Sequence, residues 1–170
     1  MPTVKKSIEV DVPVRVAYDQ WTQFEEFPRF MDGVEAVQQL DDTRLHWRAK
    51  VASKVEEWDA EITEQVPDKI IAWRSTSGAR NEGIVRFTPL GESKTKIELE
   101  MHWEPKDVTE RIGDVLGADD MRIQGDLGRF KKFIEERRSP TGAWRGKISG
   151  DKVEGDRAEE HQETGTRSRG

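Results

Sequence analysis

Cysteine is absent from the sequence, and this excludes disulfide bonds, thiolate metal ligands and a cysteine nucleophile. Histidine is scarce: the chain holds three, and none lies among acidic residues at the spacing typical of metal ligands. We therefore predict neither a metal site nor a cofactor.

Long apolar runs are also missing. The longest, Ile70–Trp73, has four residues, whereas a membrane-spanning helix needs about 20. The first ten residues, MPTVKKSIEV, contain no apolar stretch of the length found in secretion signals, so the expected localisation is cytoplasmic. The formal charge is −6, from 28 basic and 34 acidic residues. A nucleic-acid partner, which requires a basic surface, is not expected.

Apolar residues make up only 34% of the chain, and they thin out sharply near residue 138. The last 33 residues contain five apolar side chains, Ala143, Trp144, Ile148, Val153 and Ala158. Such a segment cannot bury enough surface to offset the entropy lost on ordering. We therefore predict one folded domain over residues 1–138 and a disordered polar tail over residues 139–170.

The domain shows the pattern of one strand, two short helices, six strands and one long helix. Apolar and polar residues alternate over residues 4–12 and again over residues 34–104, as in half-buried strands. Two short helical patterns lie between these stretches, and apolar residues recur every three or four positions over residues 119–137. The alternation changes parity between Val55 and Trp58, which predicts a β-bulge near Glu56-Glu57.

This order predicts an α+β fold: a seven-stranded antiparallel curved sheet wrapped around a long C-terminal helix, with two short helices after the first strand. Each strand has one apolar and one charged face, so the amphipathic helix must cover the apolar face. A bent sheet around a helix leaves a gap that suits a small molecule.

Several segments carry a more specific signal. AYDQWTQFEEFPRFMDGVEAVQQL (17–40) combines a tryptophan with an aromatic-proline-aromatic step, GIVRFTPLG (83–91) is a G-x-V-x-F strand, and DLGRFKKFIEERR (126–138) ends the long helix. These segments resemble the START-like (SRPBCC, helix-grip) superfamily, in particular its polyketide cyclase/dehydrase or coenzyme-Q-binding branch. TGAWRG (141–146) resembles a tail of some actinobacterial-type members. The resemblance implies a helix-grip fold over residues 3–138, in a superfamily that includes aromatase/cyclases, quinone or lipid carriers and hormone receptors.

The leading hypothesis is that the domain binds a small hydrophobic or aromatic molecule, of lipid, quinone or polyketide type, between sheet and helix. Four of the six tryptophans fall on the apolar parity of four strands, where they either line a cavity or pack as core. The candidate ligand contacts are Trp47, Trp58, Trp73, Val85, Phe87, Leu99, Met101 and Trp103 from the strands, and Leu127 and Phe130 from the helix.

The second hypothesis is an aromatase/cyclase or dehydrase acting on a polyketide-type substrate, and it needs polar groups inside the cavity. Arg74 and Arg86 have the parity opposite to the tryptophans, and so do His46 and His102, so all four are predicted on the outer face. Ser75 shares the cavity parity, but the sequence indicates no partner that would make it a nucleophile. The catalytic residues, if the chain is an enzyme, are unknown.

The third hypothesis is a protein-interaction or chaperone-like module. Trp144 is an isolated aromatic residue in a polar segment. It either docks on a protein partner or packs on the chain's own domain.

Overall fold

The structure, a computed structural model, describes residues 3–51, 54–78, 80–103, 112–150 and 152–154. The side chains of Val51, Trp103 and residues 112–120 are outside the described set.

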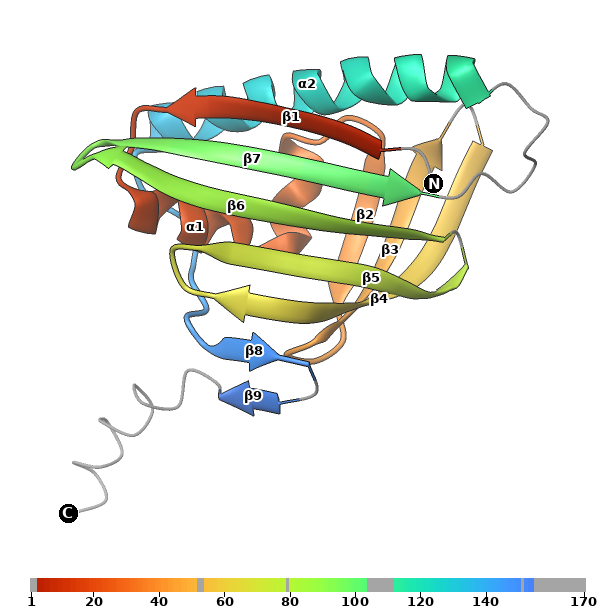
Figure 1. The fold of residues 1–170 in the computed structure, drawn as a ribbon, viewed down its shortest axis with the longest axis horizontal. Helices are drawn as coiled ribbons and strands as arrows, with labels where there is room; N and C mark the ends of the chain where they lie inside the picture. The colour runs from red at the N-terminus through yellow and green to blue at the C-terminus, as the bar shows by residue number, and fades with distance from the viewer. Residues whose placement is uncertain (1–2, 52–53, 79, 104–111, 151, 155–170) are drawn as a thin grey trace.

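The elements follow the order expected from the sequence (Figure 1). They are β1 (Thr3–Val10), α1 (Val14–Trp21), the 3-10 helix η1 (Phe24–Arg29), β2 (Val34–Gln39), β3 (Arg44–Val51), β4 (Lys54–Val66), β5 (Ile70–Gly78), β6 (Asn81–Gly91), β7 (Lys94–Trp103), α2 (Ile112–Arg137), β8 (Lys147–Ser149) and β9 (Lys152–Glu154). The main sheet runs β1-β7-β6-β5-β4-β3-β2, and every neighbouring pair is antiparallel.

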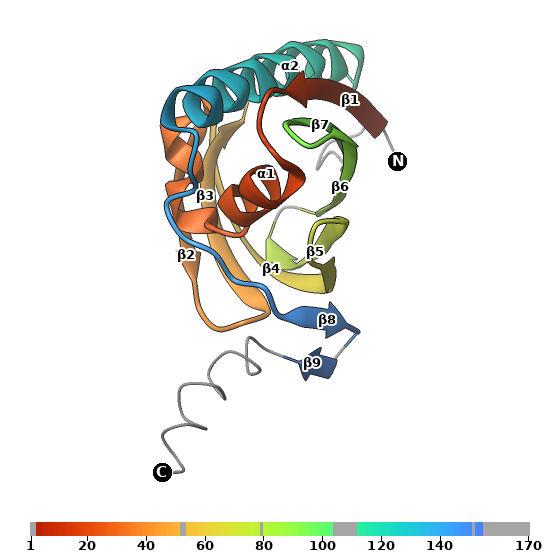
Figure 2. The ribbon, with the colours of Figure 1, turned by 90° about the vertical axis from the view of Figure 1, so that its left-hand side faces the viewer.

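The sheet curves, and both α-helices, the short α1 and the long α2, lie on its concave side. Figure 2 shows the strands wrapping around α1, with α2 closing the arc beside β1. The apolar face of the alternating strands points into this arc and supplies fully buried residues such as Leu45, Ile71 and Ile97. In the described ranges no helix combines the length and apolar character that a membrane crossing needs.

The predicted strand count of seven is wrong, because the described residues form a nine-stranded sheet. β8 extends the sheet along the end of β4, with Gln65 opposite Ile148, and β9 pairs with β8. The long helix α2 is therefore not the last element of the fold.

Residues 139–149, here called the strap, run from the end of α2 past α1 to the edge of β4 (Figure 2). The Thr141 backbone N–H donates to Gln20 Oε1 at 2.9 Å, Trp144 packs against the core and Ile148 is fully buried. The prediction of a disordered polar tail over residues 139–170 is therefore wrong for residues 139–150 and 152–154, which pack on the domain or extend its sheet. A few well-placed side chains order a segment whose average composition is polar. Residues 151 and 155–170 lie outside the described residues.

Arg145 holds the strap to the domain. Its guanidinium binds the carboxylates of Asp19 and, at 2.9 Å, Asp68, and it lies 5.5 Å above the centre of the Tyr18 ring. Asp19 is nearly buried. Burial raises the pKa of Asp19, and the hydrogen bond and charge of Arg145 oppose this rise. A strap without Arg145 would leave this carboxylate enclosed without its main partner.

The predicted bulge near Glu56-Glu57 is also wrong. β3 and β4 pair without a shift from Arg44↔Glu61 to Val51↔Lys54. Val55, the residue that suggested a change of parity, points outward and is 45% exposed. The irregularities of β4 occur instead in its pairing with β5, between Asp59 and Ala60 and between Ile62 and Glu64.

Candidate functional site

Strand alternation places the predicted ligand contacts on the concave face of the sheet. Trp47 of β3 lies opposite Trp58 of β4, and Val85 of β6 lies opposite Leu99 of β7. Trp73, Phe87 and Met101 belong to the same face, and α2 adds Leu127 and Phe130. Trp103 is part of β7, but its side chain is outside the described residues.

One end of this concave face is filled by aromatic rings. Phe130 of α2 lies 5.4 Å from Trp21 and 5.1 Å from Phe30, measured between ring centres. Phe87 contacts Tyr18 and Trp21 in the same cluster. Val85 and Phe130 are fully buried and Leu127 is 2% exposed, so these three residues pack as core.

The other end keeps accessible surface. Trp58 and Met101 are half-buried, whereas Trp47, Trp73 and Leu99 are between 6% and 9% exposed. The rings of Trp47 and Trp58 are stacked, with centres 5.9 Å apart and planes 7° from parallel. This end is less completely enclosed than the other, although Trp47, Trp73 and Leu99 still belong to the buried core cluster.

Gly83 shapes the floor beside these tryptophans. A Cβ atom at this position would lie 2.4 Å from Cζ2 of Trp73 and 2.9 Å from Sδ of Met101. The glycine of the G-x-V-x-F segment thus lets the Trp73 indole lie directly on the backbone of β6.

Phe27 is a contact of the site that the sequence analysis did not assign. Its ring lies 5.8 Å from Trp47 and 5.3 Å from Trp21, and it joins the stacked pair to the aromatic cluster. Phe27 falls on the apolar face of the second short helical pattern, but nothing in the local sequence predicts that η1 packs against β3.

The polar groups considered for catalysis do not converge on the concave face. Arg74 is 62% exposed and pairs with Glu61 at 3.5 Å, and Arg86 pairs with Glu100 at 3.6 Å on the outer face. Ser75 Oγ accepts the backbone N–H of Asn81 at 3.0 Å, which is a structural role at a strand end.

Comparison with known proteins adds to this geometry. Residues 10–132 match the model of a family described as polyketide cyclase / dehydrase and lipid transport. The chain belongs to this family. The resemblance to START-like proteins inferred from the sequence segments is confirmed.

Relatives of this polyketide cyclase family member extend over most of its length. An uncharacterized 17.2 kDa protein from the melC2-rnhH intergenic region of Streptomyces lincolnensis is 52% identical over 149 residues, which are 87% of this chain and 99% of the relative. A Deinococcus radiodurans structure is 27% identical with a TM-score of 0.66, over 81% of this chain and 99% of the other. A START superfamily protein from Mycobacterium smegmatis has 15% identity and a TM-score of 0.64, over 79% and 95% of the two chains, and shows the fold alone.

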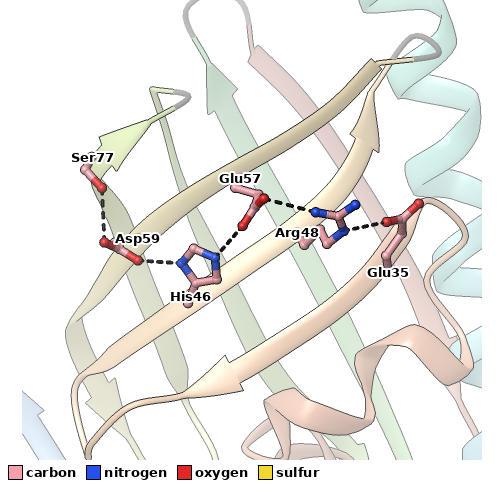
Figure 3. Close-up of polar contacts among 6 residues, drawn as sticks. All are labelled: Glu35, His46, Arg48, Glu57, Asp59 and Ser77. Atoms are coloured by element: carbon pink, nitrogen blue, oxygen red, sulfur yellow. Dashed lines mark hydrogen bonds and ion pairs between the residues drawn. The ribbon is translucent and has the colours of Figure 1, made fainter.

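The outer face of this family member carries a chain of polar contacts across four strands (Figure 3). His46 Nδ1 lies 2.7 Å from Asp59 Oδ1, and His46 Nε2 lies 2.8 Å from Glu57 Oε1. Arg48 continues the chain from Glu57 to Glu35 of β2, and Ser77 of β5 donates to Asp59 at 3.1 Å. Both histidine nitrogens face carboxylates, so the arrangement favours the imidazolium form. The outward position of His46 agrees with its parity in the sequence.

The pKa of His46 is expected to lie above its ordinary value of about 6.5, because it is hydrogen-bonded to Asp59 and Glu57. This network stabilises the fold below pH about 6.5, and the contribution is lost as the pH rises through the raised pKa of the folded state. The contribution is small because the groups are solvated.

NMR titration of the His46 ring measures the pKa directly. Asp59→Asn should lower it, while Ser77→Ala, which removes a neutral neighbour of Asp59, should change it less. Equal pKa values in wild type and Asp59→Asn would contradict the assignment.

A hollow of about 410 Å³ also lies on the outer face, over β4 to β7. Glu64, Ala72, Arg74, Glu82 and His102 line it, from strand positions that alternate with those of the tryptophans. Trp73 and Gly83 are also part of its lining. The hollow therefore borders the strand segment that carries Trp73, one of the predicted ligand contacts.

Proposed function

We propose that this polyketide cyclase family member binds a small hydrophobic or aromatic molecule between the concave face of the sheet and α2. The supporting observation is the arrangement of the strands: indoles from β3, β4 and β5 share the concave face, while Arg74, Arg86 and His46 face outward. Apolar aromatic surface next to small residues suits an uncharged ligand.

We restrict the proposed ligand contacts to the less enclosed end of the concave face. Val85, Leu127 and Phe130 are core, and Phe87 belongs to the aromatic cluster near α1. The residues that keep accessible surface are at the opposite end of the concave face. The proposed contacts are Trp47, Trp58, Trp73, Leu99 and Met101.

The aromatase/cyclase hypothesis gains no support from the described side chains. An arginine that orients substrate carbonyls has to point into the cavity, and Arg74 and Arg86 are instead held on the outer face by Glu61 and Glu100. Binding without an assigned reaction is the function that the geometry favours.

Ligand binding is tested by thermal unfolding with a panel of quinones, polyketides, fatty acids and flat aromatic dyes. A ligand that binds only the folded protein, at 100 times its Kd, stabilises the fold by about 2.7 kcal/mol and raises Tm. We expect at least one compound to bind at micromolar strength and to quench tryptophan fluorescence.

The matched variants for this test are Trp73→Ala, on the concave face, and Arg48→Ala, on the outer face. Trp73→Ala should weaken binding, whereas Arg48→Ala should leave it unchanged. A panel that produces no shift of Tm at all would remove the ligand-binding proposal.

A further inference from the structure

The hollow on the outer face of the sheet has an apolar floor. Ala72 of β5 lies opposite Ile84 of β6 on one side and opposite Glu64 of β4 on the other, and all three line the hollow of about 410 Å³. Ala72 is 8% exposed and Ile84 is half-buried. A single methyl group between longer side chains leaves a depression in which a hydrocarbon chain can lie out of water.

Two carboxylates at the rim of this floor carry uncompensated charge. Glu64 and Glu82 are exposed lining residues, and the side chain of neither one pairs with another residue of the described ranges. The other polar lining groups are engaged: Arg74 pairs with Glu61 at 3.5 Å, and His102 Nε2 lies 3.0 Å from Glu100. The hollow therefore presents net negative charge above an apolar surface, and a cationic ligand complements it.

The spacing of the two carboxylates indicates the shape of that cation. Glu64 is two strands away from Ile84 in the register, and Glu82 precedes Ile84 by two residues on β6. Strands about 4.8 Å apart with a rise of about 3.3 Å per residue place the Cα atoms of Glu64 and Glu82 about 12 Å apart. Side chains at this distance bracket an elongated molecule. In agreement, the described residues contain no acidic or histidine cluster that fits a metal ion.

We propose that the hollow binds a linear aliphatic diamine, with one ammonium group at Glu64, the other at Glu82, and the methylene chain over Ala72 and Ile84. Each ammonium group donates to a carboxylate, and the methylene groups contact the apolar floor. The site is open to solvent and its ion pairs are exposed, so the affinity is modest, with a Kd in the millimolar range.

The test is a titration of the full chain with 1,5-diaminopentane, followed through the methyl signals in ¹H–¹³C NMR spectra. The signals of Ala72 and Ile84 should shift and give the Kd, while the signals of Val85, fully buried on the opposite face of β6, should stay in place. n-Pentylamine, which has one ammonium group, should bind about two to five times more weakly, as the loss of one exposed ion pair predicts. Pentane-1,5-diol, which has none, should cause no shift.

Matched variants separate a specific site from attraction to an acidic protein. Glu64→Gln and Glu82→Gln should each raise the Kd of the diamine about two- to fivefold. Glu92→Gln changes the net charge equally, but Glu92 lies in the turn after β6, at the end of that strand away from the hollow, so the Kd should not change. Arg74→Gln should lower the Kd because it removes a competing cation. Ala72→Leu fills the hollow without changing its charge and should abolish binding.

Three results would each overturn the diamine site. The first is a titration in which the Ala72 and Ile84 signals do not move. The second is an equal Kd for 1,5-diaminopentane and n-pentylamine, since only one carboxylate would then take part. The third is an effect of Glu92→Gln as large as that of Glu64→Gln or Glu82→Gln, because the diamine would then respond to net charge alone.

Discussion

Truncation after Arg138 is expected to lower the free energy of unfolding by about 4 kcal/mol or more. The cut removes Ile148, which is fully buried, and Trp144, which packs against the core. It also removes Arg145, the main partner of the nearly buried Asp19. Urea unfolding monitored by tryptophan fluorescence measures the loss, and Tm should fall by about 10 °C or more for a domain of this size.

Truncation after Glu154 is the matched control, since it retains every contact of the strap described above. Arg145→Ala isolates the ionic part of the effect, and the double variant with Asp19→Asn should recover some of the loss because no unpaired carboxylate then remains enclosed. A chain ending at Arg138 that unfolds at the same urea concentration as the full chain would show that the strap contributes nothing to stability.

The order of the strap could not be predicted from amino-acid composition. Five apolar side chains in 33 residues indicate disorder on average, but Trp144, Ile148 and Val153 all pack against the core. Arg145 looks like one more charge in a polar segment, because its partners Asp19 and Asp68 are more than 70 residues away in sequence. The segment TGAWRG was the one local indication of order, but it did not predict which residues Trp144 packs against.

The concave face, by contrast, could be predicted residue by residue. Alternation depends on the two-residue repeat of a strand, so it placed Trp47, Trp73 and Leu99 inside and His46 and Arg74 outside without knowledge of the pairing. Alternation gave a wrong prediction at Val55, an apolar residue that is exposed near a strand end.

Alternation cannot separate a residue that lines a space from one that fills it. Val85 and Trp73 have the same parity, and both are predicted ligand contacts, but Val85 is fully buried whereas Trp73 is 9% exposed. The difference depends on which rings from α1 and η1 pack on each strand residue: Tyr18 contacts Phe87, and Phe27 contacts Trp47. Long-range packing of this kind leaves no trace in the periodicity of a single strand.

This division between filled and open ends predicts opposite effects for two residues proposed from the same pattern. Phe130→Ala should lower the free energy of unfolding by about 3–5 kcal/mol, because the ring is fully buried against Trp21 and Phe30 and its loss leaves a cavity. Met101→Ala removes a half-buried, flexible side chain and should cost about 1–2 kcal/mol.

Ligand affinity should rank the two variants the other way. Met101 lies at the less enclosed end beside Trp73, so its loss should weaken binding of any ligand found with the panel. Phe130→Ala, assayed below its own Tm, should bind with nearly wild-type Kd because its ring is enclosed by other aromatic residues. Chemical denaturation and calorimetry on both proteins measure the two quantities. A stable Phe130→Ala protein that no longer binds ligand would place the binding site at the α1 end of the sheet instead.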